Sequence, residues 1–158
     1  MNKLVSIEEI VPIMKEQMAE GGEVSFTPKG NSMLPLFRSD RDVVTLSPPR
    51  FPLKKYSIVF YQRKNGQYVL HRLVGKKESG YIMRGDNQYQ NEYGIMEEQI
   101  IAVVSEFVRN GKSHYITDKG YRWYCIFWSR TMYLRKMYKI LRHMAGRMKR
   151  KISGYKSR

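Results

Sequence analysis

Short segments rich in Val, Ile, Tyr and Phe, separated by turn-forming residues, most constrain how this chain can fold. Asn65-Gly66 and Asn110-Gly111 are typical of tight hairpin turns, and each lies between two such segments. Short strands with little helix between them predict a mainly β domain with a largely antiparallel sheet. The expected strands cover residues 23–27, 42–46, 56–61, 67–74, 80–84, 100–108 and 113–117.

A helix is predicted at each end of the β domain. Ser6 and Glu9 have the spacing of a capping box, apolar residues follow at helical intervals, and Gly21-Gly22 ends this helix near residue 20. At the other end, an apolar stripe recurs at helical spacing among basic residues. The stripe consists of Trp123, Phe127, Leu134, Met137, Leu141, Met144 and Met148. The chain therefore divides into an N-terminal helix (1–22), a β domain (23–121) and a basic amphipathic helical tail (122–158).

Positive charge is concentrated in the tail. Residues 1–121 contain 17 basic and 14 acidic side chains, whereas residues 122–158 contain 12 basic side chains and no acidic ones. Three interpretations of the tail remain open. In the first, the apolar stripe of the tail packs on the β domain. In the second, the tail lies on an anionic membrane surface. The third is non-specific binding to nucleic acid phosphates, but no motif for sequence-specific recognition accompanies the charge.

The composition excludes several classes of protein. Cys125 is the only cysteine, which excludes an intramolecular disulfide framework and a cysteine-based zinc site. No uncharged apolar run reaches the length of about 18 residues that a membrane-spanning helix needs, and the N-terminus lacks the apolar region of a signal peptide. We therefore expect no metal, no cofactor and a cytoplasmic location, peripheral on the inner membrane face if the tail binds lipid.

Ser32 is the first residue of the β domain that could carry chemistry. It follows an expected strand, and Gly30 and Pro35 bracket it in a tight turn. Such a turn can expose a hydroxyl group and point backbone N–H groups at one place. Serine in a turn commonly only hydrogen-bonds to the local backbone, so a catalytic role requires a base nearby.

His71 is the candidate base. Strand alternation places it on the same face as Val69 and Leu73, in partly apolar surroundings. It is either a buried histidine that hydrogen-bonds to the backbone or a general base, whose usual pKa near neutrality suits proton transfer. Asp86, in the turn Gly-Asp-Asn, is first of all a turn residue, and becomes a third catalytic group only if it orients His71.

Taken together, these motifs resemble the superfamily of type I signal peptidases and LexA-like peptidases. Gly-x-Ser-Met-x-Pro surrounds Ser32, His71-Arg72 follows on a hydrophobic strand, and Arg-Gly-Asp-Asn surrounds Asp86, in that order. More narrowly, the chain is similar to the branch with histidine in place of the catalytic lysine, as in archaeal and endoplasmic-reticulum signal peptidases. The resemblance covers residues 23–112 and implies a coiled β-sheet domain of the LexA and signal-peptidase type.

The resemblance also implies a function, that of a serine endopeptidase that cleaves a peptide or leader segment. Ser32 would be the nucleophile, His71 the base and later the acid, and Asp86 the group that orients His71. Backbone N–H groups around Ser32 would hold the oxyanion, without metal or cofactor. Arg72 is expected to be structural, pairing with an acid or a carbonyl. The substrate would be an extended peptide beside a strand edge, with small side chains before the cut.

Four departures separate this chain from the family pattern. It has no membrane-spanning anchor, Gly30 lacks the hydroxyl that several members carry there, and Lys55-Tyr56 replaces a common Gly-Asp pair. Glu92 occupies the place where some relatives have a second aspartate, which leaves open whether Asp86 or Glu92 assists His71.

Two other functions remain open beside the peptidase. One is a LexA-like self-cleaving regulator, although the chain shows no N-terminal DNA-binding module and no Ala-Gly cleavage site before Ser32. The other is a catalytically degenerate protein that binds peptide or membrane. Because the serine, histidine and aspartate are all retained, the sequence favours the enzyme.

Overall fold

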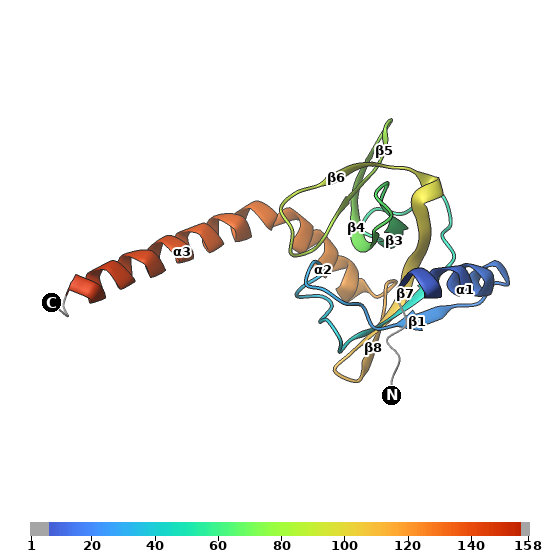
Figure 1. The fold of residues 1–158 in the computed structure, drawn as a ribbon, viewed down its shortest axis with the longest axis horizontal. Coiled ribbons are helices and arrows are strands. Elements are labelled where there is room, and N and C mark those ends of the chain that lie inside the picture. The colour runs from blue at the N-terminus through green and yellow to red at the C-terminus, as the bar shows by residue number, and fades with distance from the viewer. Residues whose placement is uncertain (1–6, 156–158) are drawn as a thin grey trace.

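Eight strands form one antiparallel sheet in the computed structural model, which describes residues 7–155 (Figure 1). The strand order is β1-β2-β7-β3-β4-β5-β6, and β8 pairs with β7. All seven expected strands are present, so the mainly β fold class is confirmed. The strands are β1 (Val24–Phe26), β2 (Val43–Ser47), β3 (Ile58–Gln62), β4 (Tyr68–Lys77), β5 (Gly80–Arg84), β6 (Glu92–Ile95), β7 (Ile100–Arg109) and β8 (Lys112–Tyr115).

Strand β6 is the one that the sequence did not predict. It has four residues, includes Gly94, and pairs with β5 at the end of the sheet. An edge strand is paired on one side only, so it can be short and polar and needs no alternating apolar pattern. Strand β6 is important for the candidate site because its first residue is Glu92.

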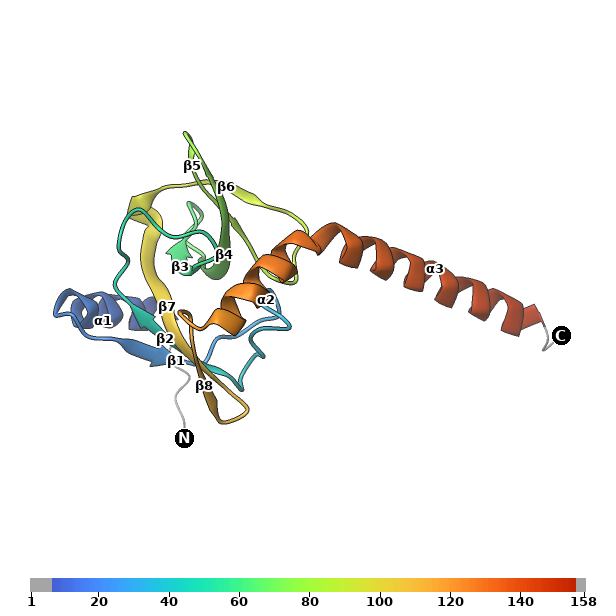
Figure 2. The same cartoon turned by 180° about the vertical axis from the view of Figure 1, so that it is seen from behind.

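Three α-helices and a short 3₁₀ helix complete the fold. They are α1 (Ile7–Ala19), η1 (Glu97–Gln99), α2 (Lys119–Arg130) and α3 (Met132–Tyr155). The predicted N-terminal helix is confirmed, although Ser6 of its capping box lies outside the described residues. The prediction of one continuous helix in the tail is wrong, because the helix breaks at Thr131 (Figure 2). The Thr131 hydroxyl donates to the Phe127 carbonyl at 2.8 Å, a backbone contact that bends helices.

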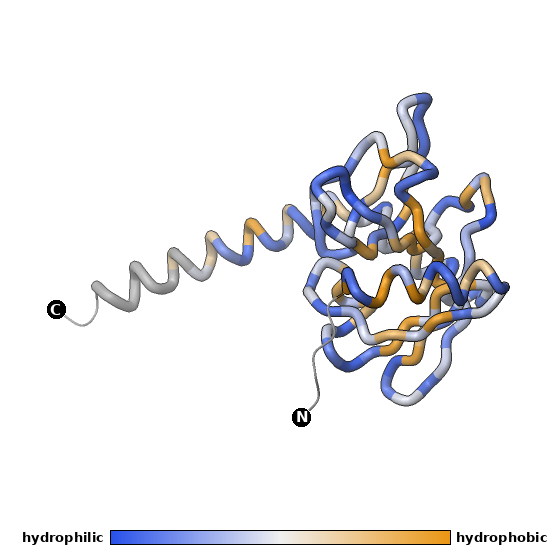
Figure 3. Tube along the Cα trace, turned by 45° about the vertical axis from the view of Figure 1, so that its right-hand side comes forward, coloured by the Kyte–Doolittle hydropathy of each residue, from blue (hydrophilic) through white to orange (hydrophobic). Residues whose placement is uncertain are grey.

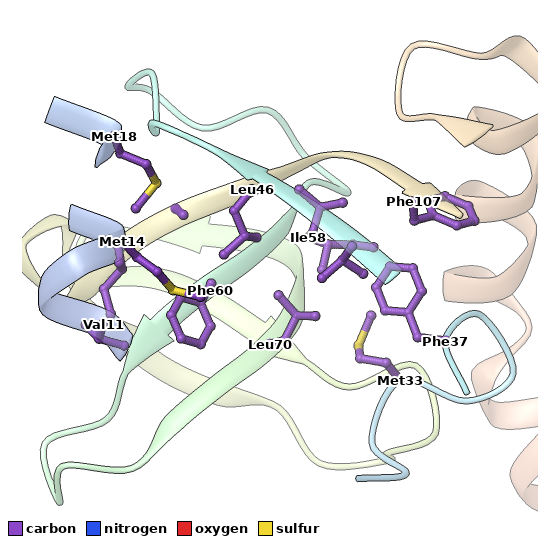
Figure 4. Close-up of a cluster of buried hydrophobic side chains, with 14 of the residues drawn as sticks. Val11, Met14, Met18, Met33, Phe37, Leu46, Ile58, Phe60, Leu70 and Phe107 are labelled. Atoms are coloured by element: carbon purple, nitrogen blue, oxygen red, sulfur yellow. The ribbon is translucent and has the colours of Figure 1, made fainter. Parts of the chain in front are cut away.

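The larger hydrophobic cluster lies between α1 and the sheet and reaches the loop that contains Ser32. Val11 and Met14 of α1 lie at one end of this cluster, and Met33 and Phe37 of the serine loop lie at the other (Figure 4). All four side chains are at most 5% exposed. The loop is therefore held in place by the same core that holds the helix.

A second cluster occupies the other face of strands β3 and β4. Val59 pairs with His71 and Tyr61 pairs with Val69 across these strands. Val59, Tyr61, Val69 and Leu73 all belong to this cluster. His71 therefore shares its strand face with Val69 and Leu73, as strand alternation predicts.

The two tail helices differ in how they meet the β domain. Helix α2 lies against it through Tyr121 and Tyr124, which pack on the first cluster, and through buried Cys125. Helix α3 projects away from the domain (Figures 1 and 2). The apolar stripe from Trp123 to Met148 is 56% to 73% exposed, so the interpretation that this stripe packs on the β domain is wrong. Over residues 7–155, no helix has both the length and the apolar character required to cross a membrane.

Candidate active site

The loop between β1 and β2 holds Ser32 in a half-buried position. Gly30 has a φ of +100°, a left-handed conformation that glycine adopts without strain, and its N–H donates to the Ser39 hydroxyl at 3.0 Å. Met33 is 5% exposed and Phe37 is 2% exposed, so the residues after the serine fasten the loop to the core. Ser32 itself is half-buried. The loop thus combines a fixed backbone with a hydroxyl close to solvent.

The Gly-Asp-Asn turn after β5 holds the serine loop from the other side. The Asn87 backbone N–H donates to the Ser32 carbonyl at 2.8 Å, and the Asn87 side-chain amide donates to the Asn31 carbonyl at 3.1 Å. Gly85 lies so close that a Cβ there would be 2.6 Å from the Ser32 carbonyl oxygen. Glycine is therefore required at position 85 for the two segments to touch.

His71 is almost completely buried in β4, at 1% exposure. Its Nδ1 lies 3.0 Å from Glu92 Oε1 and 3.3 Å from the Tyr61 hydroxyl. A carboxylate only accepts hydrogen bonds, so Nδ1 carries the proton that Glu92 accepts. This tautomer leaves the lone pair on Nε2, the ring nitrogen that a base needs.

Glu92 is fixed by two further donors. Arg63 binds both carboxylate oxygens, with its Nε 2.8 Å from Oε2, and the Tyr61 hydroxyl donates to Oε2 at 2.8 Å. Burial alone would raise the pKa of Glu92, but the hydrogen bonds from Arg63 and Tyr61 hold this pKa below its usual value. Glu92 is therefore a charged carboxylate at neutral pH, held against the imidazole.

Burial controls the protonation of His71. Removal of the imidazolium from water lowers the pKa of His71 from 6.5 to about 4, and this effect outweighs the attraction of Glu92. The imidazole is therefore neutral at neutral pH. Its single N–H proton is on Nδ1, facing Glu92, and its Nε2 is free to accept a proton.

Asp86 does not contact His71 in the way that the resemblance implies. Its two oxygens accept hydrogen bonds from Nε and Nη2 of Arg72, each at 2.7 Å, in a bidentate ion pair. Adjacent strand residues point to opposite faces, so Arg72 and its partner lie on the other side of β4 from the His71 imidazole. The carboxylate in contact with His71 is Glu92, one of the two that the sequence left open for this position.

Arg72 has the structural role that the sequence predicts, and it connects the turn to α2. Its Nη1 donates to the Tyr56 carbonyl at 3.0 Å, the Tyr121 hydroxyl at 3.2 Å and the Cys125 sulfur at 2.8 Å. Burial alone would lower the pKa of Arg72, but the hydrogen bonds and charge of Asp86 raise it well above its usual value. This guanidinium therefore stays charged inside the protein.

Helix α2 supports the site, a role that was not predicted from the sequence. Trp128 Nε1 donates to the Asp86 carbonyl at 2.9 Å. The packed side of the helix has its own helical spacing, separate from that of the exposed stripe, and this spacing was available as a signal. The packed residues are Tyr121, Tyr124, Cys125 and Trp128 of α2, followed by Met132 at the start of α3.

Ser32 and His71 line the same pocket, which has a volume of about 250 Å³. One wall is formed by residues 28–33, and the other by residues 67–71 of β4 and the turn before it. Pairing of β4 with β5 begins at Arg72, so within the described chain residues 68–71 have a strand partner on the β3 side alone. The pocket therefore opens beside an unpaired strand edge.

Nothing in the described residues suggests a metal site. Residues 7–155 contain no group of three or more histidine, cysteine, aspartate or glutamate side chains placed to hold a metal ion. No family model matches the chain, and no curated protein is significantly similar to it. The geometry of the pocket thus provides the basis for assigning a function.

The close approach of Gly85 to the serine loop gives a first prediction. Gly85→Ala forces Cβ against the Ser32 carbonyl and should lower the free energy of unfolding by about 1–3 kcal/mol. Hydrogen exchange of the Asn87 amide, which donates to Ser32, should accelerate. Gly120→Ala is the control, because its Cβ meets open space on α2. Unchanged exchange at Asn87 in Gly85→Ala contradicts the contact.

The buried imidazole gives a second prediction, on pH. Between pH 6.5 and about 4 the unfolded chain binds a proton at His71 that the folded chain excludes, so the free energy of unfolding falls as pH falls through this range. Urea titrations of wild type and His71→Gln should show a smaller decrease in the variant. His143→Gln, which changes an exposed histidine, should decrease like wild type. If the free energy of unfolding decreases equally in all three proteins, His71 is not the group that excludes the proton in the folded chain.

Proposed function

We propose that this protein is a serine endopeptidase of the signal-peptidase-like and LexA-like type, with Ser32 as nucleophile and His71 as general base. One observation carries the proposal: Ser32 and His71 line a single pocket, and the imidazole is held by a charged carboxylate on its far nitrogen. This arrangement supplies a hydroxyl, a neutral base and a group that stabilises the protonated base. The order of the motifs supports the same family.

The reaction divides into two steps. His71 Nε2 takes the proton of the Ser32 hydroxyl while Oγ attacks the substrate carbonyl, and backbone N–H groups of the loop stabilise the oxyanion. The C–N bond then breaks, and His71 returns the proton to the leaving amine. Water hydrolyses the acyl-enzyme in the second step, with His71 again as base and Ser32 as the leaving group.

Glu92 serves as the positioning residue for His71 in this proposal. It accepts the Nδ1 proton, fixes the tautomer and stabilises the imidazolium that forms during the reaction. Arg63 and Tyr61 hold Glu92 in place. Asp86 instead supports the fold around the site through Arg72.

The pocket suits an extended peptide. The edge of β4 at residues 68–71 offers backbone groups that a substrate strand can pair with, and residues 28–32 form the opposite wall. A cavity of about 250 Å³ accommodates small side chains next to the cleaved bond. The substrate class is therefore a peptide or protein segment that can become extended, with small residues before the cut.

Covalent labelling tests the nucleophile and its base. A serine-reactive fluorophosphonate should add once to the wild-type protein, with the adduct on the peptide that contains Ser32, as measured by intact and tandem mass spectrometry. Ser32→Ala should abolish the adduct, and His71→Ala should slow its formation by about 10²-fold or more. Ser113→Ala, on exposed β8, is the control and should label normally. A folded wild-type protein that forms no adduct contradicts the proposal and favours a binding protein without catalysis.

Paired carboxylate variants separate the two acidic residues. Glu92→Gln should leave the protein folded, reduce the labelling rate on the order of 10²-fold, and move the acid limb of its pH profile to lower pH, because the negative charge of Glu92 raises the pKa of His71. Asp86→Asn should instead cost about 3–5 kcal/mol of stability, since it removes the charge that balances buried Arg72. Among the folded molecules of that variant, the acid limb should move to lower pH by much less than in Glu92→Gln, because Asp86 raises the pKa of His71 less than Glu92 does. The reverse pattern would assign Asp86 to His71.

A further inference from the structure

The two tail helices each expose apolar side chains that the β domain does not cover. We define this surface, the tail stripe, by seven residues that are each at least 56% exposed. At about 100° per residue, the two positions on α2 fall on one side of that helix, and the five on α3 fall on one side of α3. Folded proteins rarely expose an apolar surface of this extent unless it binds a partner. The members are Trp123, Phe127, Leu134, Met137, Leu141, Met144 and Met148.

The first turns of α3 fix the direction in which the tail stripe faces. Arg135 donates to the Asp86 carbonyl at 3.3 Å, and its guanidinium lies 3.6 Å from the Trp128 ring centroid. Lys136 and Lys139 lie about 6 Å from the ring of Tyr89 in the segment after the Gly-Asp-Asn turn. At the start of α3, the cationic side therefore meets the domain and the apolar side turns away from it. Figure 3 shows hydrophobic and hydrophilic residues recurring along the described part of this projecting helix.

The charge of the tail selects among partners for such a surface. A second copy of the chain could cover the apolar residues, but residues 122–158 contain 12 basic and no acidic side chains, so two tails would repel each other. Nucleic acid would satisfy the charge and leave the apolar side chains in water. An anionic lipid surface satisfies both requirements, because acyl chains accept the apolar side and headgroups attract the cations.

We propose that α2 and α3 lie in the plane of an anionic lipid bilayer, with the tail stripe inserted at the boundary between headgroups and acyl chains. Trp123 and Phe127 enter near the β domain, and the methionines and leucines of α3 continue the contact outward. Arg130 and Arg142 are exposed at and beside the stripe, where they reach lipid phosphates. This docking is independent of the proposed catalysis.

Docking would also orient the candidate active site. Arg84 donates to the Ser129 carbonyl at 3.3 Å and Trp128 donates to the Asp86 carbonyl at 2.9 Å, so α2 is tied to the turn that holds Ser32. A bilayer that binds α2 therefore sets the position of the pocket relative to the lipid surface. Segments close to that surface would meet the pocket first.

Vesicle flotation tests the proposal with the full chain. After nuclease treatment, the protein should float with phosphatidylcholine vesicles that contain phosphatidylglycerol and remain below vesicles of phosphatidylcholine alone. Leu134→Gln/Leu141→Gln should reduce partitioning at least about tenfold, because both side chains lose their apolar contact. Ile13→Gln/Tyr115→Gln is the matched control, since it changes exposed apolar residues outside the tail and should float normally.

Two double variants with the same change in net charge test the electrostatic contribution to lipid binding. Arg130→Glu/Arg142→Glu should reduce partitioning by roughly 25-fold or more, since each cation near an anionic surface contributes about fivefold. Lys54→Glu/Lys55→Glu changes the net charge equally on the β domain and should retain most of the binding. Equal losses in both charge variants overturn the proposal, because they show attraction to the whole protein rather than to the tail.

Tryptophan fluorescence tests whether the tail stripe enters the lipid. The emission of wild type should shift to shorter wavelength with the anionic vesicles and be quenched by brominated lipid, and Trp123→Phe should lose both changes. An unaltered spectrum overturns the proposal. Sedimentation of the protein without lipid supplies a further test. If the wild type is a dimer that does not float with vesicles, and Leu134→Gln/Leu141→Gln is a monomer, the tail stripe binds a second copy of the chain. That result overturns lipid docking.

Discussion

A buried ion pair between Arg72 and Asp86 joins three parts of the molecule that must stay together for the site to exist. Arg72 comes from the middle of β4, Asp86 from the turn that touches the serine loop, and the guanidinium also binds α2 through Tyr121 and Cys125. Removing two charges from water is costly, and the bidentate geometry and the additional hydrogen bonds offset that cost. Either residue without the other would leave an unbalanced buried charge, so the pair fixes the arrangement of strand, turn and helix.

The same strand also explains why the site uses two carboxylates. His71 and Arg72 are neighbours in β4, and strand geometry points them to opposite faces. One carboxylate cannot reach both, so Asp86 balances the guanidinium on one side and Glu92 contacts the imidazole on the other. The first interaction holds the backbone in place, and the second controls a proton. The motif that contains Ser32, His71 and Asp86 is therefore divided in space: Asp86 pairs with Arg72, and His71 contacts Glu92, which lies outside the motif.

The tail shows a comparable division between two helical faces. Tyr121 and Cys125 on one face of α2 pack against the domain around Arg72, whereas Trp123 and Phe127 on the other remain exposed. The break at Thr131 lets α3 leave the surface of the domain while Arg135 still contacts the Asp86 carbonyl. One segment thus contributes to the site with its packed face and offers an apolar, cationic surface with the other.

Local patterns in the sequence determined every described strand except β6, the first helix, the turn around Ser32 and the face of β4 that carries His71, because alternation and turn chemistry act over a few residues. Tertiary structure decided which carboxylate meets the imidazole. Glu92 reaches His71 because β6 pairs with β5 at the sheet edge, a long-range pairing that leaves no alternating pattern in four residues. It also decided which stripe of the tail packs, since both stripes have helical spacing and the choice depends on contacts that only the folded domain provides.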